Sequence, residues 1–134
     1  MHYDSLSNLV ANINAAYKSL APSIIVYNTT LSRRILYLLI TLGYINSFII
    51  LDSYKIQIFL KYNDYNRPAV RNIQRVSKPG NRVYVPSTML KAFIKNTNLN
   101  NDYQVAIMTT SMGLLTGQEA VKYKVGGELL LLIN

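Results

Sequence analysis

Hydrophobic residues in the first third of the chain recur every three or four positions, which predicts two amphipathic helices. Asp4 can cap the first helix and Pro22 ends it. The second helix is expected to end at Gly43. Its cap is one of Asn28, Thr29 and Thr30. The predicted inner faces are Leu6, Leu9, Ile13 and Tyr17 or Leu20 in the first helix, and Leu31, Ile35, Leu38, Leu39 and Leu42 in the second.

Strand-like segments separate and follow these helices. Ser23 to Tyr27 is short and apolar, and Tyr44 to Leu51 predicts a buried strand. From Lys55 to Tyr62 the pattern alternates, which predicts a half-buried strand. Its inner side chains are expected to be Ile56, Ile58, Leu60 and Tyr62, and its outer ones Lys55, Gln57 and Lys61. The first half therefore predicts one sheet covered by two helices.

Asn63 to Pro68 is rich in turn formers and predicts a domain boundary, with one domain over residues 1–66 and another over 67–134. Strands are expected at 70–76, 82–85, 103–109 and 128–133, and turns at 77–81 and 126–127. The predicted fold class is α+β in two small domains. The first is an α-β-α-β-β unit, and the second is mostly β with short helices.

Two short helices are expected in the second domain. One opens at Pro86-Ser87, with Met89, Leu90, Phe93 and Ile94 inside and Lys91 and Lys95 outside, before a loop over Asn96 to Asp102. The other runs from Thr116 to Lys124, because Thr116 and Glu119 have the spacing of a capping box.

Charge narrows the range of partners. The 134 residues carry a formal net charge of +8, with a pI of about 9.8. Such an excess favours a polyanionic partner, nucleic acid or anionic lipid, over charge kept for solubility alone. The apolar run Ile35 to Leu51 behind Arg33-Arg34 leaves a membrane-associated basic protein as the alternative. Gly43 and Asn46 interrupt that run, which favours a helix followed by a strand.

Composition also indicates where the gene lies. Ile, Asn and Tyr are abundant, with 11 Tyr, and these residues have AT-rich codons. Met1 to Leu20 contains Asp4 and several Asn and Ser, so it does not look like a signal peptide, and no Arg-rich transit segment is visible. The composition indicates a gene in an AT-rich genome, with an organelle genome among the candidates. If the protein works in an organelle, we expect it to be made there.

Catalytic chemistry has little support in the sequence. There is no Cys, and the single His is His2. The six acids, Asp4, Asp52, Asp64, Asp102, Glu119 and Glu128, form no pair at one-turn helical spacing, and nucleotide-binding glycine patterns are absent. We therefore expect no enzyme activity, no metal and no cofactor.

Two segments have the chemistry to bind RNA. Arg67, Arg71, Arg75, Lys78 and Arg82 surround a Pro-Gly turn, where they can neutralise phosphates. Tyr84 beside them either stacks on a base or packs in the core. In Thr109-Thr110-Ser111-Met112-Gly113, a strand delivers three hydroxyls to a loop whose glycine allows close approach. By itself such a loop is more often an ordinary turn.

A resemblance to a known family changes that balance. Thr109 to Thr116, Glu119-Ala120 and Gly126-Gly127-Glu128 closely resemble the C-terminal signature of ribosomal protein S8 of the small subunit. Arg75 to Tyr84 resembles the family's second signature, and Asp4–Ile13 and Leu31–Ile45 resemble its first two helices. The resemblance covers essentially the whole chain.

The resemblance implies a two-domain α+β protein that binds a central-domain helix of the small-subunit rRNA early in assembly and lies beside ribosomal protein S5. The hydroxyl residues Thr109, Thr110 and Ser111 would contact the RNA, and Gly113 would let the backbone approach it closely. Glu128 would either order the loop or accept a hydrogen bond from the RNA. The full set of expected RNA-binding residues is Thr109, Thr110, Ser111, Met112, Gly113, Glu128, Arg75, Ser77, Lys78, Arg82 and Tyr84.

The chain also departs from the family pattern. Met112 stands where Lys or Gln is frequent, Gly117 replaces the usual Asp, Gln118 a basic residue, and Asn14 a common Arg. Fewer phosphate contacts suggest a divergent rRNA. Together with the composition, this favours a mitochondrial ribosome with an organelle-encoded protein over a plastid or bacterial one.

Overall fold

The computed structural model describes residues 5–90, 92 and 105–134. It forms two compact units, residues 1–71 and 72–134. Both helices and antiparallel sheets are present, so the predicted α+β class is confirmed. Several predictions lie outside the described residues: the Asp4 cap, the side chains of Lys91, Phe93, Ile94 and Lys95, the loop at 96–102 and the strand start at Tyr103.

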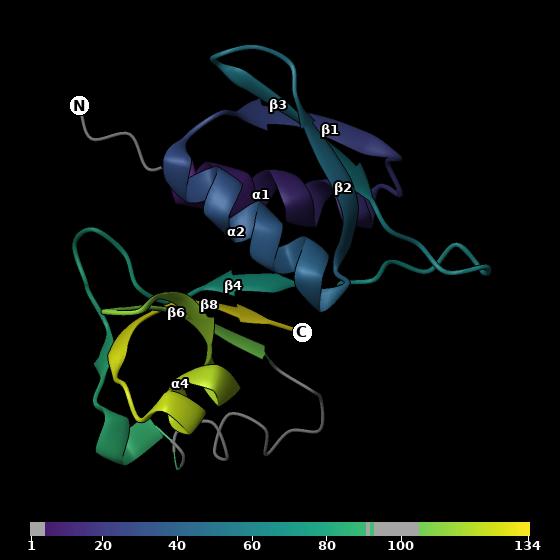
Figure 1. Cartoon of the computed structure of the whole chain (residues 1–134). Helices are drawn as coiled ribbons and strands as arrows, with labels where there is room; N and C mark the ends of the chain where they lie inside the picture. Colours follow the sequence, from purple (N-terminus) through teal and green to yellow (C-terminus); the bar gives the residue numbers. More distant parts are fainter. Residues whose placement is uncertain (1–4, 91, 93–104) are drawn as a thin grey trace. The chain divides into compact units, whose positions relative to one another are not determined.

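Unit 1 is a three-stranded antiparallel sheet in the order β1-β3-β2, with two helices on one face (Figure 1). Its helices are α1 (Ser5–Lys18) and α2 (Thr30–Leu42). Its strands are β1 (Ser23–Tyr27), β2 (Ile45–Ile50) and β3 (Lys55–Leu60). The alternation predicted for β3 is confirmed, because Ile56, Ile58 and Leu60 are buried beneath the helices.

The helix ends have identifiable causes. Thr29 is the cap of α2, and its hydroxyl accepts from the Ser32 backbone N–H at 3.0 Å. Gly43 ends that helix with a φ of 83°, as predicted. Helix α1 buries Tyr17, whereas Leu20 adopts a φ of 59° and lies 55% exposed. The first helical face is therefore completed by Tyr17.

Two details of unit 1 differ from prediction. Helix α2 buries Ser32 and Leu36 rather than Leu31 and Leu38, so its inner face is rotated. Strand β2 was predicted to be buried, which is wrong, since most of its side chains are exposed. It is an edge strand, and the helices cover only one face of the sheet.

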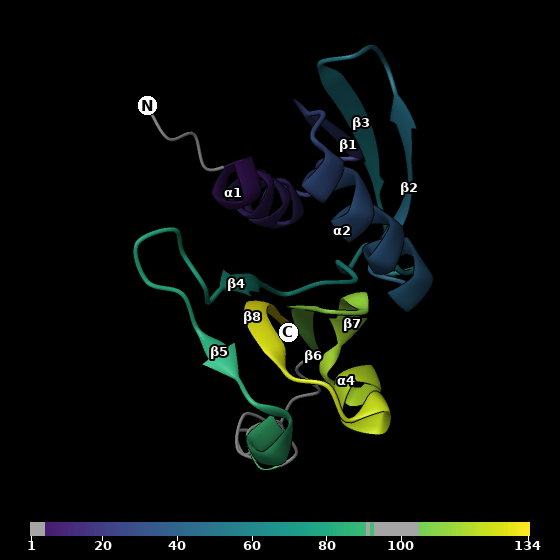
Figure 2. The ribbon, with the colours of Figure 1, turned by 60° about the vertical axis from the view of Figure 1, so that its left-hand side comes forward.

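Unit 2 is an antiparallel sheet in the order β4-β8-β6-β7, with β5 also paired to β8. Its strands are β4 (Ile73–Arg75), β5 (Tyr84–Val85), β6 (Val105–Thr110), β7 (Gly113–Thr116) and β8 (Gly127–Ile133). Figure 2 shows helix α4 (Gly117–Tyr123) following β7 directly. Its capping box at Thr116 and Glu119 is confirmed. Residues 87–90 are also helical.

The core of unit 2 lies between this sheet and its helical segments. It is built from Val85, Leu90, Ala106, Met108, Leu115, Ala120 and Leu129. The apolar final strand, β8, is buried at almost every position. Other strands pair with it along both of its edges. Strands β4 and β5 are shorter than the predicted spans of 70–76 and 82–85.

The run over residues 35–51 folds as a helix followed by a strand. In the part of the chain that the structure describes, no helix is both long and apolar enough to cross a bilayer.

Candidate nucleic-acid interface

The two predicted RNA-binding segments both pair with the first residues of β8, one along each edge of that strand. Glu128 pairs with Tyr84 on one side and with Thr109 on the other. Residues opposite one another in neighbouring strands point to the same face of a sheet, so these three form one row about 10 Å across. Tyr84 is 69% exposed, which places its ring outside the core. The row thus presents an aromatic side chain and a threonine on one surface.

The next row explains why glycine precedes Glu128. Gly127 lies between Val85 and Thr110, and a Cβ atom there would meet the Thr109 carbonyl oxygen at 2.3 Å. At Gly126 a Cβ would come within 2.7 Å of the Ser87 nitrogen and the Val85 oxygen. Gly-Gly was predicted to be a turn, which is wrong for Gly127, since it begins β8. The pair instead lets three backbone segments approach closely.

The predicted loop at 109–113 is in fact a tight hairpin. Thr109 and Thr110 end β6, Gly113 begins β7, and only Ser111 and Met112 form the turn. Both turn residues are exposed, Met112 by 54%. Strand β7 (Gly113–Thr116) is absent from the sequence-based prediction, which ends the strand at Thr109 and continues as a loop.

The Thr110 hydroxyl stabilises this hairpin. It donates to the Gly113 carbonyl at 2.9 Å and accepts from the Met112 N–H at 3.1 Å. Gly113 has a φ of 96°, a conformation that an L residue rarely adopts. The Thr110 hydroxyl hydrogen is thus used within the turn, and its oxygen keeps one acceptor site for a ligand. Ser111 presents its hydroxyl at the tip.

A buried carboxylate holds the basic segment against the sheet. Glu128 is 8% exposed, and its Oε1 accepts from the Ser77 hydroxyl at 2.5 Å and from Arg82 Nη1 at 2.9 Å. Ser77 is fully buried, and its oxygen also accepts from the Val83 N–H at 3.3 Å. Ser77 was predicted among the RNA contacts, but it has no surface to offer a ligand in this structure. Its hydroxyl instead anchors the ends of the 77–83 segment.

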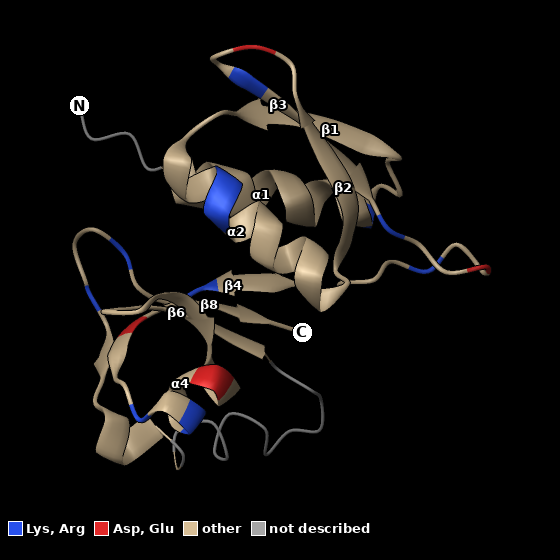
Figure 3. Cartoon of the chain, in the orientation of Figure 1, with Lys and Arg blue, Asp and Glu red and all other residues tan. Residues whose placement is uncertain are grey.

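Around this anchor the cations are displayed outward. Arg75 Nε donates to the Ser77 carbonyl at 2.7 Å, and the Lys78 and Asn81 backbones bond to each other across the turn. Lys78 is exposed, and the Arg82 side chain is 51% exposed although it bonds to Glu128. Figure 3 shows Lys and Arg in the loop between β4 and β5, and an acid at the start of β8. These cations are accessible to phosphates, and the hydrogen bonds around them hold the segment that carries them in place.

Opposing effects set the charge of Glu128. Burial raises the pKa of its carboxyl, but hydrogen bonds from Ser77 and Arg82, together with the positive charges of Arg82 and Arg75, outweigh this effect and hold the pKa below the ordinary value of 4.5. The carboxylate therefore stays ionised at neutral pH.

This shift predicts a pH-dependent stability. Because the folded pKa is the lower one, the ionised Glu128 contributes its full stabilisation above about pH 4.5 and loses it as the pH falls through the folded pKa. We expect Glu128→Gln to cost about 1–2 kcal/mol at pH 7, where a charged hydrogen-bond acceptor is lost. Urea unfolding at a series of pH values checks this, and the gap between the two proteins should narrow below pH 4.5. A gap that stays constant down to the lowest pH would contradict the role given to the charge.

No group of three His, Asp or Glu residues that could hold a metal ion occurs among the residues described. What this face offers is exposed cations, hydroxyls and an aromatic ring on a fixed backbone, the set of groups suited to phosphates, ribose and bases.

Comparison with known proteins gives a consistent result. A family model described as ribosomal protein S8 matches residues 4–133. The chain is 41% identical over 129 residues to small ribosomal subunit protein uS8m of Acanthamoeba castellanii, covering 96% of this chain and 98% of that protein. It is 32% identical over 130 residues to uS8 of Salinibacter ruber, covering 95% and 93%. It is 34% identical over 131 residues to uS8 of Syntrophus aciditrophicus, covering 95% and 94%.

Proposed function

This chain belongs to the ribosomal protein S8 family, and we propose that it binds a central-domain helix of the small-subunit rRNA through the face described above and supports subunit assembly. The family is structural and non-enzymatic, so the protein serves as a component of the small ribosomal subunit. The observation that carries the RNA proposal is the row of Tyr84, Glu128 and Thr109. This row joins the two segments with RNA-binding chemistry into one surface.

The residues of this face have different tasks. The hydroxyls of Thr109, Thr110 and Ser111 hydrogen-bond to RNA, Met112 packs beside it, and Gly113 lets the backbone approach. Lys78, Arg82 and Arg75 meet phosphates, and the exposed ring of Tyr84 stacks. Ser77 and Glu128 act through the others by holding the 77–83 segment in place.

The proposed cellular location rests on the names of the relatives and on the amino-acid composition. We assign the protein to a mitochondrial ribosome, because one relative at 41% identity is named as a uS8m protein. The abundance of Tyr, with 11 residues, and of other residues with AT-rich codons supports an organelle-encoded gene. Ribosomal protein S5 is the proposed neighbour in the subunit, as the family resemblance implies.

Salt dependence tests the phosphate contacts. Binding of a small-subunit rRNA fragment should weaken as salt rises, because phosphate contacts release counterions. The plot of log affinity against log salt has a negative slope, and Lys78→Gln should make that slope shallower by about 0.7–0.9, the value of one phosphate contact. Lys61→Gln is the matched control, since Lys61 is exposed in unit 1. An unchanged slope for Lys78→Gln would remove this residue from the interface.

A further inference from the structure

Strand β1 is an edge of the sheet in unit 1, and it lacks the features that usually protect an edge. Its sequence, Ser-Ile-Ile-Val-Tyr, contains neither a charge nor a proline. Proteins commonly protect edge strands with Lys, Pro or bulges, because unpaired backbone groups recruit other chains. The opposite edge, β2, has a register irregularity between Ile45 and Ser47, but the β1 pairing is regular throughout. The unprotected edge is therefore β1.

The hydrogen bonds at the ends of β1 fix which residues point outward. Leu60 N–H donates to the Pro22 carbonyl at 3.1 Å, and Asn28 N–H donates to the Tyr54 carbonyl at 2.8 Å. In an antiparallel pair, bonded and non-bonded positions alternate. Even-numbered residues of β1 thus bond to β3, and the N–H and C=O of Ile25 face away from the sheet.

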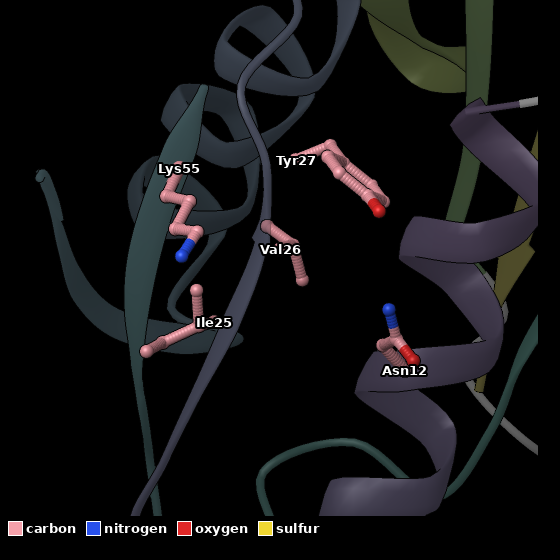
Figure 4. Close-up of a pocket in the computed structure, with 5 residues that line it drawn as sticks. All are labelled: Asn12, Ile25, Val26, Tyr27 and Lys55. Atoms are coloured by element: carbon pink, nitrogen blue, oxygen red, sulfur yellow. The ribbon is translucent and has the colours of Figure 1, made fainter. Parts of the chain in front are cut away.

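A pocket of about 240 Å³ lies along the same strand. It is lined by Asn12, Ile25, Val26, Tyr27 and Lys55. Figure 4 shows Asn12 projecting from α1 toward β1, and Lys55 extending from β3 on the other side of the strand. Ile25 is 56% exposed, so its apolar side chain is accessible beside its own outward-facing N–H and C=O. The edge thus offers backbone hydrogen bonds together with space for side chains.

We propose that β1 receives an extended, acidic segment of a partner protein, which adds a strand to this sheet. Backbone groups at strand spacing recognise another extended backbone, in the mode known as strand addition. The alternate side chains of the added strand would lie against Ile25 and within the pocket. Lys55 and the net charge of +8 favour carboxylates among them. This interaction is separate from the RNA face, which lies entirely in unit 2.

The probe is a blocked, fluorescent peptide of about eight residues that alternates Val and Glu, long enough to form one strand. The fluorescence anisotropy of the dilute peptide should rise and saturate as the protein is added, with a dissociation constant below about 1 mM. A matching peptide of alternating Val and Lys should bind more weakly. Absence of binding by the acidic peptide up to that concentration would overturn the proposal.

Two proline substitutions test which edge binds. Ile25→Pro removes an outward N–H and leaves the bonds to β3 in place, and it should weaken peptide binding roughly tenfold or more. Ile50→Pro is the matched control on β2. Leu51 N–H donates to the Lys55 carbonyl, so the N–H of Ile50 also faces outward, and Ile50 is 54% exposed. Equal peptide binding by the wild type and Ile25→Pro would overturn the proposal.

A second variant leaves the backbone unchanged. Lys55→Glu should reverse the preference, so that the Val-Lys peptide binds better than the Val-Glu peptide. Unchanged preference would contradict the acidic partner, whether or not Ile25→Pro folds.

Two further results would also overturn the proposal. If Ile25→Pro converts a dimer to a monomer in sedimentation, the occupant is a second copy of the chain. If Ile25→Pro lowers rRNA affinity but not peptide affinity, the edge binds nucleic acid.

Discussion

Gly127→Ala is expected to destabilise unit 2 by more than about 3 kcal/mol, the upper range for overpacking. The added Cβ would meet the Thr109 carbonyl oxygen at 2.3 Å and the Thr110 Cγ2 at 3.0 Å. The first of these atoms belongs to the backbone of β6, so it cannot move without breaking the pairing of β6 with β8. Urea unfolding followed by circular dichroism measures the loss.

The same substitution should weaken rRNA binding, because it displaces the strand that carries the hydroxyls. Gly80→Ala is the matched control. Gly80 lies in the turn of the basic segment, nothing lies within 4 Å of its added Cβ, and it lacks a positive φ. We expect a change of less than about 0.5 kcal/mol there. If Gly127→Ala unfolds at the same urea concentration as Gly80→Ala, β8 and β6 do not need this close approach.

Local patterns were sufficient to predict most elements of the fold. The alternation of apolar and polar residues at 55–60 matched the burial of β3, and the capping box at Thr116 opened α4. These features depend on residues a few positions apart. The inner face of α2 was less predictable, because Leu, Ile and Tyr occur on most sides of that helix and packing selects Leu36 and Leu39.

The site depends on contacts that are far apart in the sequence, so its internal roles were not predictable. Ser77 is expected among the RNA contacts, and Glu128 is expected either to order the hairpin or to accept a hydrogen bond from RNA. In the structure the Ser77 hydroxyl instead donates to the Glu128 carboxylate, 51 positions away in the sequence. No local pattern identifies such a pair. The two adjacent glycines before an apolar strand are the available signal for close backbone approach, although a Gly-Gly pair equally predicts a turn. The sequence allows Tyr84 either in the core or at the surface, and the structure places it at the surface.

The hairpin substitution with the largest expected effect on binding removes all three hydroxyls. The variant Thr109→Val, Thr110→Val, Ser111→Ala keeps β-branched side chains in β6 while it deletes hydrogen-bonding groups. At about 1 kcal/mol for each lost hydrogen bond, the affinity for rRNA should fall by roughly 100-fold. Thr110→Val also loses two bonds within the turn, so unfolding of the variant is measured in parallel.

The dissociation constant of this triple variant for the small-subunit rRNA, beside those of the wild type and of Ser53→Ala, tests the central claim most directly. Ser53 is an exposed hydroxyl residue in unit 1 and serves as the control. We predict that the triple variant remains folded and binds about 100-fold more weakly, and that Ser53→Ala binds like the wild type. A folded triple variant with wild-type affinity would contradict the assignment of this hairpin to the RNA interface.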